Sequence, residues 1–274
     1  MDKIREASMA TLLELSAPDR FFKKSVGRTH RLMVAVHGAQ QPLPSAFAER
    51  DPGLQWALRH QQKHLRTVGF KPPLVGVIPS TSLAATTGKE PIVYLGGLHR
   101  SIHVLGKGTI LNTDVVVVDH EHPATVVMQT RDCPVIVLLN DKTGDYAVIH
   151  GMRDLLTPNE RGQNMVSTAL DAVAPHVNER PSVYLYATAG VSAAAFPNYP
   201  EKAAPFLKHY GEPVFGDVAK GELDLFLVAR ETVQRLGVPA DHCLRDTLCT
   251  VTTPWLGSLR GNKPRPNSVF VSLQ

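Results

Sequence analysis

Cys133 and His150 bracket the segment that most constrains this chain, because the residues between them form two apolar runs joined by a polar turn. The first run covers residues 134–139, the turn covers 140–145 and contains Gly144, and the second run covers 146–149. Apolar β-branched runs on either side of a short turn with glycine predict a β-hairpin. Antiparallel pairing brings the start of the first strand beside the end of the second. The sequence therefore predicts that the Cys133 thiol and the His150 imidazole are neighbours in space.

The amino-acid composition limits which classes of protein and which kinds of partner are compatible with this chain. The chain has 274 residues, of which 43% are hydrophobic and 20% charged, as is usual for soluble globular proteins. A net charge of +4, dispersed along the sequence, argues against a nucleic-acid partner, which requires a concentrated basic patch. Three cysteines are too few for a disulfide framework and favour a reducing compartment. No signal peptide and no apolar run of about 18 residues is visible, so we expect a soluble cytoplasmic protein without a membrane segment.

The order of the predicted elements indicates the fold class. We expect residues 1–24 to form a short amphipathic helix or a loosely attached arm, and residues 25–274 to form one domain. Strands are predicted at 74–78, 92–95, 114–118, 125–128, 182–187, 243–253 and 268–273, and helices at 52–68, 157–177 and 222–237. This mixture predicts a single α/β (α+β) domain with mixed β-sheet layers flanked by helices.

Several short motifs occur in an order that resembles one known family. Residues 130–134 resemble a Thr-Ala-Asp-Cys-Xaa-Pro strand start, and residues 150–153 resemble the beginning of a His-Ala-Gly-Trp-Arg-Gly segment. Weaker matches follow the same order at 97–99, 113–114, 190–193, 249–250 and 258–260. Over roughly residues 90–274 the chain is similar to the laccase-domain family, also called the YfiH or multicopper polyphenol oxidoreductase family and associated with purine nucleoside phosphorylase activity. The resemblance implies a YfiH-like fold.

The resemblance also implies a metal site. His99, Cys133 and His150 would be three ligands of one metal ion, zinc rather than copper, and His103 is a rival for the first position. Two imidazoles and one thiolate with an open fourth position are typical of catalytic zinc. Copper oxidation of polyphenols ranks lower, because one such cluster does not supply the histidine pairs of a multicopper centre.

The activity implied by the family is a zinc-dependent reaction on a purine nucleoside. It would be phosphorolysis, as in a purine nucleoside phosphorylase, or hydrolytic deamination, as in an adenosine deaminase. Asp132 would support the metal site or accept a proton, and Arg153 or Arg260 would hold phosphate oxygens. Ser192, in a loop of small residues, would contact the substrate. The expected partners are therefore a nucleoside and phosphate.

Two alternatives remain open. Cys133 could be a nucleophile with His150 as its base, giving a metal-independent cysteine hydrolase or amidase, an option raised only by analogy with toxin deamidases of a related fold. Alternatively, the chain could be a degenerate, non-catalytic binding protein. The family tryptophan is missing after His150, and Arg153 follows its histidine at three rather than four residues. Cys243 is expected only to pack.

Overall fold

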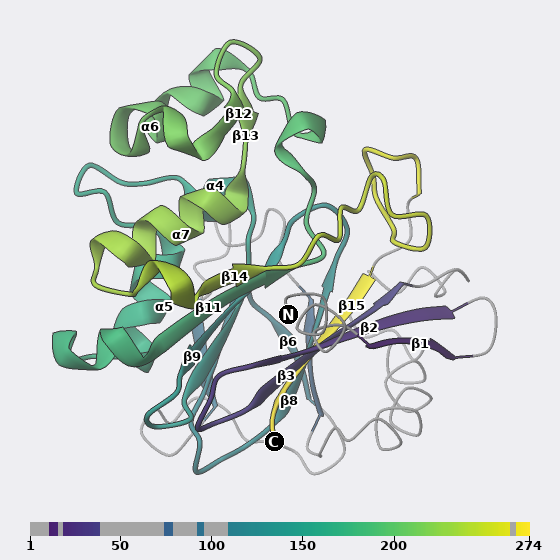
Figure 1. Cartoon of the computed structure of the whole chain (residues 1–274), viewed down its shortest axis with the longest axis vertical. Helices are drawn as coiled ribbons and strands as arrows, with labels where there is room; N and C mark the ends of the chain where they lie inside the picture. The colour runs from purple at the N-terminus through teal and green to yellow at the C-terminus, as the bar shows by residue number, and fades with distance from the viewer. Residues whose placement is uncertain (1–10, 16–18, 39–73, 79–91, 96–108, 264–266) are drawn as a thin grey trace, which may run out of the picture.

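The protein folds into three layers in which helices cover a six-stranded sheet and a seven-stranded sheet lies behind it (Figure 1). A computed structural model describes residues 11–15, 19–38, 74–78, 92–95, 109–263 and 267–274. The six-stranded sheet has the order β14 (Cys243–Arg245), β11 (Val183–Thr188), β9 (Val135–Asn140), β10 (Tyr146–His150), β7 (Val115–Val118) and β5 (Ile92–Leu95).

The seven-stranded sheet joins the two ends of the chain. Its order is β1 (Thr11–Leu15), β2 (Asp19–Val26), β3 (Leu32–Gly38), β15 (Asn267–Leu273), β8 (Thr125–Thr130), β4 (Leu74–Ile78) and β6 (Thr109–Asn112). The last strand, β15, pairs with both β3 and β8. A small two-stranded ribbon, β12 (Phe215–Asp217) and β13 (Glu222–Leu223), lies among the helices.

The central strands are apolar except at their ends because both of their faces are buried. Along β7, Val115 and Val117 belong to the core between the six-stranded sheet and the helices. The alternate residues Val116 and Val118 belong to the core between the two sheets. Side chains of a strand point alternately to its two faces, so a strand covered on both sides needs a continuous apolar run. This is why the run at 134–139 lacks polar alternation.

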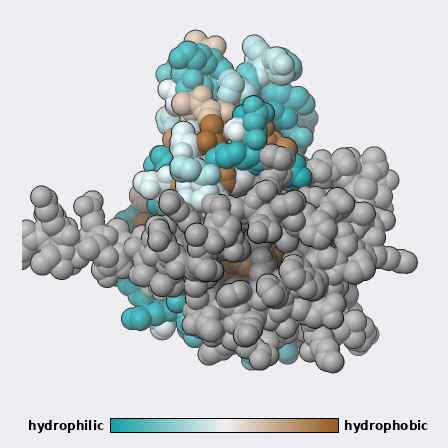
Figure 2. All heavy atoms as spheres, turned by 90° about the vertical axis from the view of Figure 1, so that its right-hand side faces the viewer, coloured by the Kyte–Doolittle hydropathy of each residue, from teal (hydrophilic) through white to brown (hydrophobic). Residues whose placement is uncertain are grey.

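The helical layer packs on the outer face of the six-stranded sheet. It consists of α4 (Arg153–Leu156), α5 (Met165–Val173), α6 (Pro200–Tyr210) and α7 (Leu225–Arg235). The described part of the surface in Figure 2 is mostly hydrophilic, as expected where helices turn their polar faces outward. Among the described residues, every helix is too short to cross a membrane.

Asn164 is the residue that begins α5. Its side-chain Oδ1 accepts hydrogen bonds from the backbone N–H groups of Val166, at 2.9 Å, and Ser167, at 3.2 Å. These are two of the donors that the first turn of any helix leaves unpaired. The N-cap explains why α5 begins at Met165, whereas the Thr157-Pro158 pair predicted a start near 157. The predicted helix 157–177 is therefore too long at both ends.

Asn164 also joins three elements of the helical layer. Its Nδ2 donates to the carbonyl of Leu156 at 3.2 Å, and to the hydroxyls of Tyr210 and Thr232 at 3.0 Å each. We predict that Asn164→Ala lowers the free energy of unfolding by about 3 kcal/mol, since it removes an N-cap and leaves buried partners unpaired. Asn164→Asp keeps the cap acceptor and should cost less. Chemical denaturation checks both values, and a loss below about 1 kcal/mol for Asn164→Ala would contradict this role.

Comparison with the sequence-based expectations confirms the fold class. The strands predicted at 74–78 and 92–95 are found as β4 and β5, and the final strand differs by one residue. The helix predicted at 222–237 is found as the shorter α7. The helix predicted at 52–68 lies outside the described residues.

Two expectations are corrected. Residues 11–15 and 19–26 are strands of the seven-stranded sheet, not a helix or a loose arm, because β2 finds a full antiparallel partner in β3. The strand predicted at 243–253 ends at Arg245, where its parallel pairing with β11 stops. The segment beyond it is a series of turns up to residue 263, and this segment contributes to the site described next.

Candidate active site

The predicted hairpin is present and brings Cys133 and His150 together. Strands β9 and β10 pair antiparallel, with His150 opposite Val135, so that Cys133 lies in the bend just before β9. The Cys133 side chain lies close enough to the imidazole of His150 to raise the pKa of that ring. Cys133 is half-buried, and His150 is only 3% exposed. The neighbourhood predicted from strand pairing is therefore confirmed.

Asp114 holds the imidazole from the opposite side. Its Oδ1 lies 3.0 Å from Nδ1 of His150, and its backbone carbonyl accepts the His150 N–H at 2.8 Å. Asp114 is fully buried and immediately precedes β7, the strand that pairs with β10. Because Nδ1 is engaged by Asp114, Nε2 is the nitrogen left for Cys133. A carboxylate in this position fixes the orientation and the tautomer of a histidine.

The electrostatics of the three groups favour a protonated imidazole. Burial alone would lower the pKa of His150. The interactions with Asp114 and Cys133 outweigh burial and raise the pKa from its usual 6.5 to about 9. In the absence of a metal ion, the arrangement thus places a cationic ring beside a sulfur atom.

The bend that carries Cys133 is held by hydrogen bonds of its neighbours. The carbonyl of Asp132 accepts the N–H of Val191 at 2.9 Å, and the carbonyl of Pro134 accepts the N–H of Gly151 at 2.7 Å. A Cβ added to Gly190 would lie 2.8 Å from Cβ of Pro134, so this loop can approach the bend only as glycine. The backbone on both sides of Cys133 is therefore fixed by the 190–191 loop and by the residue after His150.

The Asp132 carboxylate points toward the C-terminal segment. Oδ1 accepts the hydroxyls of Thr250 at 2.9 Å and Ser258 at 2.5 Å. Oδ2 accepts the N–H groups of Leu259 at 3.0 Å and Arg260 at 3.1 Å. The sequence predicts a role in proton transfer or metal support for Asp132. That role stays a prediction, and the observed contacts describe an anchor for residues 250–260.

A cavity of about 440 Å³ opens beside the bend. Its volume is within the usual range for small-molecule sites. Its wall includes Pro134, adjacent to Cys133 in sequence, together with residues from the loop 188–194, from α7 and from 245–249. Ser192 and Cys249 are two of the polar groups that line it. The cavity therefore places a concave, mainly apolar surface that carries a few polar groups next to the Cys133 bend.

Cys249 is a second sulfur in this cavity. Its thiol donates to the hydroxyl of Ser192 at 3.4 Å, and Sγ accepts the Ser192 N–H at 3.4 Å. Burial raises the pKa of Cys249, but hydrogen bonds from Ser192 and Thr252 outweigh burial and lower it to about 7. Cys243 differs, because burial raises the pKa of its thiol to about 11.

These values predict different reactivities for the two thiols. At pH 7 about half of the Cys249 thiol is ionised and almost none of the Cys243 thiol, and only the thiolate reacts with iodoacetamide. We expect Cys249 to be alkylated at least about 100-fold faster at pH 7, with a rate that rises through pH 7 and levels off above about pH 8. Peptide mass spectrometry over time checks this. Equal rates for both cysteines would contradict the assignment.

Arg153 and Arg260, the two arginines predicted to bind phosphate, both contact the segment 196–198. Arg153 Nη1 donates to Asn198 at 3.0 Å, and its Nε donates to Asp154 at 3.0 Å. The guanidinium of Arg260 lies 4.4 Å from the ring centroid of Phe196. Phe196 and Asn198 are two residues apart, so both arginines contact the same short stretch. Phosphate binding by these two arginines stays a prediction.

The donor set fits the metal implied by the sequence in part. Cys133 and His150 supply a sulfur and an imidazole nitrogen, and Asp114 orients the imidazole as carboxylates do for histidine ligands of zinc. The candidates for the third ligand, His99 and His103, lie outside the described residues. The chemistry of the two described donors is compatible with zinc, and the identity of the metal remains a prediction.

Sequence reasoning assigned no role to two residues of this site. Asp114 and Cys249 each fall within a short segment that resembles the family, at 113–114 and 249–250. Their place in these family-like segments is the one feature of the sequence that indicates a role. Asp114 acquires its partner through the pairing of β7 with β10, and the contact of Cys249 with Ser192 depends on a loop that sequence patterns do not place.

Comparison with solved structures supports the fold. Among solved structures, the hypothetical protein YfiH of Bacillus licheniformis is similar with a TM-score of 0.66 and 13% identity, covering 97% of both chains. A Neisseria meningitidis protein of the DUF152 family gives 0.57 and 16%, covering 97% of this chain and 99% of the other. YlmD from Geobacillus stearothermophilus gives 0.55 and 11%, covering 93% and 92%. At these identities the likeness establishes a shared fold.

Comparison at the level of sequence gives one match, to a family. No curated protein matches this chain significantly. Residues 80–264, which are more than half of the chain, match the family described as multi-copper polyphenol oxidoreductase laccase. This range contains Asp114, Cys133, His150 and Cys249. With the family-like motifs, the shared fold and this match in agreement, the chain belongs to the multi-copper polyphenol oxidoreductase laccase family.

Proposed function

We propose that the protein is a metal-dependent enzyme that acts on a purine nucleoside or a related small molecule at the Cys133–His150 site. The observation that carries the proposal is the continuous contact from Asp114 through His150 to Cys133, which orients two metal donors from a rigid sheet. Cys133, His150 and either His99 or His103 would hold zinc. When bound, zinc supplies Lewis-acid polarisation of a substrate group or of water.

The protein groups around this point have separable tasks. Asp114 orients His150, while the fixed bend keeps Cys133 in place. The adjacent cavity provides a surface for the substrate, with Ser192 as a hydrogen-bonding group on its wall. For phosphorolysis, Arg153 or Arg260 would bind phosphate oxygens through paired N–H donors. For deamination, a carboxylate such as Asp132 would move the proton.

The test combines metal analysis with product analysis. We expect purified protein to contain zinc and to convert adenosine or inosine, giving free base only with phosphate if the reaction is phosphorolysis, or ammonia without phosphate if it is deamination. Cys133→Ser should lose the zinc held at this site and at least about 100-fold of the activity. Cys243→Ser is the matched control and should retain both. Unchanged turnover in Cys133→Ser would overturn the proposal.

A second candidate is favoured by the same contacts. Asp114, His150 and Cys133 follow the acid, base and nucleophile order of a cysteine hydrolase triad. This enzyme would be unaffected by a chelator and inactivated by alkylation of Cys133. Zinc-containing protein with no turnover of any nucleoside would instead favour a binding role. Chelator treatment followed by activity measurement separates the two catalytic candidates.

A further inference from the structure

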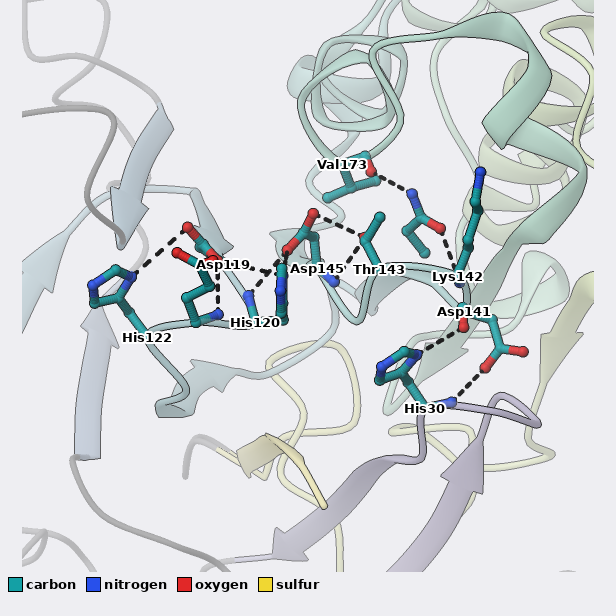
Figure 3. Close-up of polar contacts among 11 residues, drawn as sticks. His30, Asp119, His120, His122, Asp141, Lys142, Thr143, Asp145 and Val173 are labelled. Atoms are coloured by element: carbon teal, nitrogen blue, oxygen red, sulfur yellow. Dashed lines mark hydrogen bonds and ion pairs between the residues drawn. The ribbon is translucent and has the colours of Figure 1, made fainter.

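A second group of metal-binding side chains lies at the opposite end of β7 and β10 from Cys133. Because Val118 of β7 is paired with Tyr146 of β10, the residues one step beyond them, Asp119 and Asp145, reach the same rim of the sheet. The turn that follows β7 has the sequence Asp-His-Glu-His over residues 119–122. Two imidazoles and three carboxylates therefore meet where the turn after β7 faces the β9–β10 turn (Figure 3).

The donor atoms lie within a few tenths of an ångström of the spacing that ligands of one ion have. Nδ1 of His120 lies 2.9 Å from Oδ1 of Asp145 and 3.5 Å from Oδ1 of Asp119. Nδ1 of His122 lies 3.7 Å from Oδ2 of Asp119. Tetrahedral coordination with bonds near 2.0–2.2 Å places donors about 3.3–3.6 Å apart. Small side-chain adjustments would therefore bring these atoms around an ion.

Asp119 is the common member of two donor groups. The first group is Asp119, His120 and Asp145, and the second is Asp119, Glu121 and His122. Within each group the possible ligand atoms lie within 4.8 Å of one another. Figure 3 shows Asp119 between the two imidazoles. We propose that this cluster is a binding site for a divalent transition-metal ion such as Zn²⁺. Imidazole donors select such ions over Mg²⁺ and Ca²⁺, which prefer oxygen ligands.

The two turns are held in place before any ion binds. The backbone N–H of His120 donates to Oδ1 of Asp145 at 3.0 Å, and the hydroxyl of Thr143 donates to Oδ2 at 2.8 Å. Gly144 has a φ of +87°, and a Cβ there would lie 3.2 Å from Cβ of His120. A glycine in the hairpin turn thus lets His120 approach it closely. Preorganised donors lose less conformational entropy on binding an ion.

This site would be separate from the one at Cys133. Asp145 and His150 are at the two ends of β10, five residues apart, which corresponds to about 17 Å along an extended strand. The proposal therefore does not depend on the function proposed above. An ion here would join the turn after β7 to the β9–β10 turn and stabilise the rim of the central sheet.

Calorimetric titration with Zn²⁺ tests the proposal on the full chain. We expect His120→Ala/His122→Ala to bind one equivalent less than the unmodified protein, or to bind it at least about tenfold more weakly. Cys133→Ser should keep this binding event. The matched control is His176→Ala, which removes an exposed imidazole but keeps the backbone N–H that donates to Glu179, and this change should leave Zn²⁺ binding unaltered. Mg²⁺ should give no comparable heat.

Two results would overturn the site. One is a His120→Ala/His122→Ala protein that binds Zn²⁺ with unchanged stoichiometry and affinity, and the other is loss of all Zn²⁺ binding in Cys133→Ser. Cu²⁺, a paramagnetic probe, gives a second readout. It should broaden the backbone amide signals of residues 119–122 and 143–145 in Cys133→Ser, and broadening confined to other residues would also contradict the proposal. Thermal unfolding of each variant checks that it is folded.

Discussion

Replacement of Asp114 by asparagine is expected to lower the free energy of unfolding by about 3–5 kcal/mol, because it removes one partner of a buried ion pair and leaves the other buried. The side chains of both partners are almost inaccessible to solvent, and their atoms lie 3.0 Å apart. The same change should weaken zinc binding at Cys133 and His150 by about 10- to 100-fold, since a misoriented histidine is a poorer ligand. Denaturation of the metal-free protein and chelator competition measure the two effects.

A surface pair provides the control for this prediction. Asp171 accepts a hydrogen bond of 2.7 Å from Arg180, but its side chain is 54% exposed. Exposed ion pairs contribute little, so Asp171→Asn should cost no more than about 1 kcal/mol and should leave zinc affinity unchanged. If Asp114→Asn were as mild as Asp171→Asn in both measurements, Asp114 would not have the orienting role described above.

Replacement of Asp132 by alanine should have the second-largest effect. It leaves the hydroxyls of Thr250 and Ser258 without an acceptor, and both residues are fully buried. Two buried donors left unpaired predict a loss of about 3 kcal/mol. The 250–260 segment should also become more accessible to protease, because Asp132 is its main tie to the Cys133 bend. Denaturation and limited proteolysis measure these changes.

Asp132→Asn distinguishes anchoring from proton transfer. Asparagine keeps one acceptor oxygen and the shape of the side chain, so an anchoring residue should lose only about 1 kcal/mol and most of the activity should remain. A proton-transferring residue should instead lose about 100-fold or more in kcat at little cost in stability. Activity that is lost while the unfolding curve stays unchanged would contradict a purely structural role for Asp132.

The β9–β10 hairpin, and with it the proximity of Cys133 and His150, is predictable from the sequence. Strands buried on both faces have continuous apolar runs, and the turn between them contains Gly144, whose φ of +87° suits glycine. Antiparallel pairing then fixes which ends meet, so the proximity of Cys133 and His150 followed without any coordinates. The family resemblance added the expected fold, which the structure confirms.

Other features depend on contacts that local patterns do not encode. Asn164 determines where α5 begins, yet an asparagine is equally common in turns. The strands at 11–15 and 19–26 have few apolar alternations. Pairing of the second with β3, and of the first with the second, determines their conformation. Asp114 gains its role only because β7 pairs with β10 in one particular register. In each case a partner distant in sequence decides the outcome, and a single sequence gives no direct record of that partner.

The burial of the central strands on both faces has a consequence for how this protein can change. Substitutions within β7, β9 or β10 must satisfy two tightly packed cores at once, and volume changes there are costly. Residues in the turns beyond the strands are less constrained, because they do not pack into both cores. Natural variation and laboratory redesign should therefore find new specificities by altering the connecting segments at either tip, while the interior of the sheet tolerates few replacements.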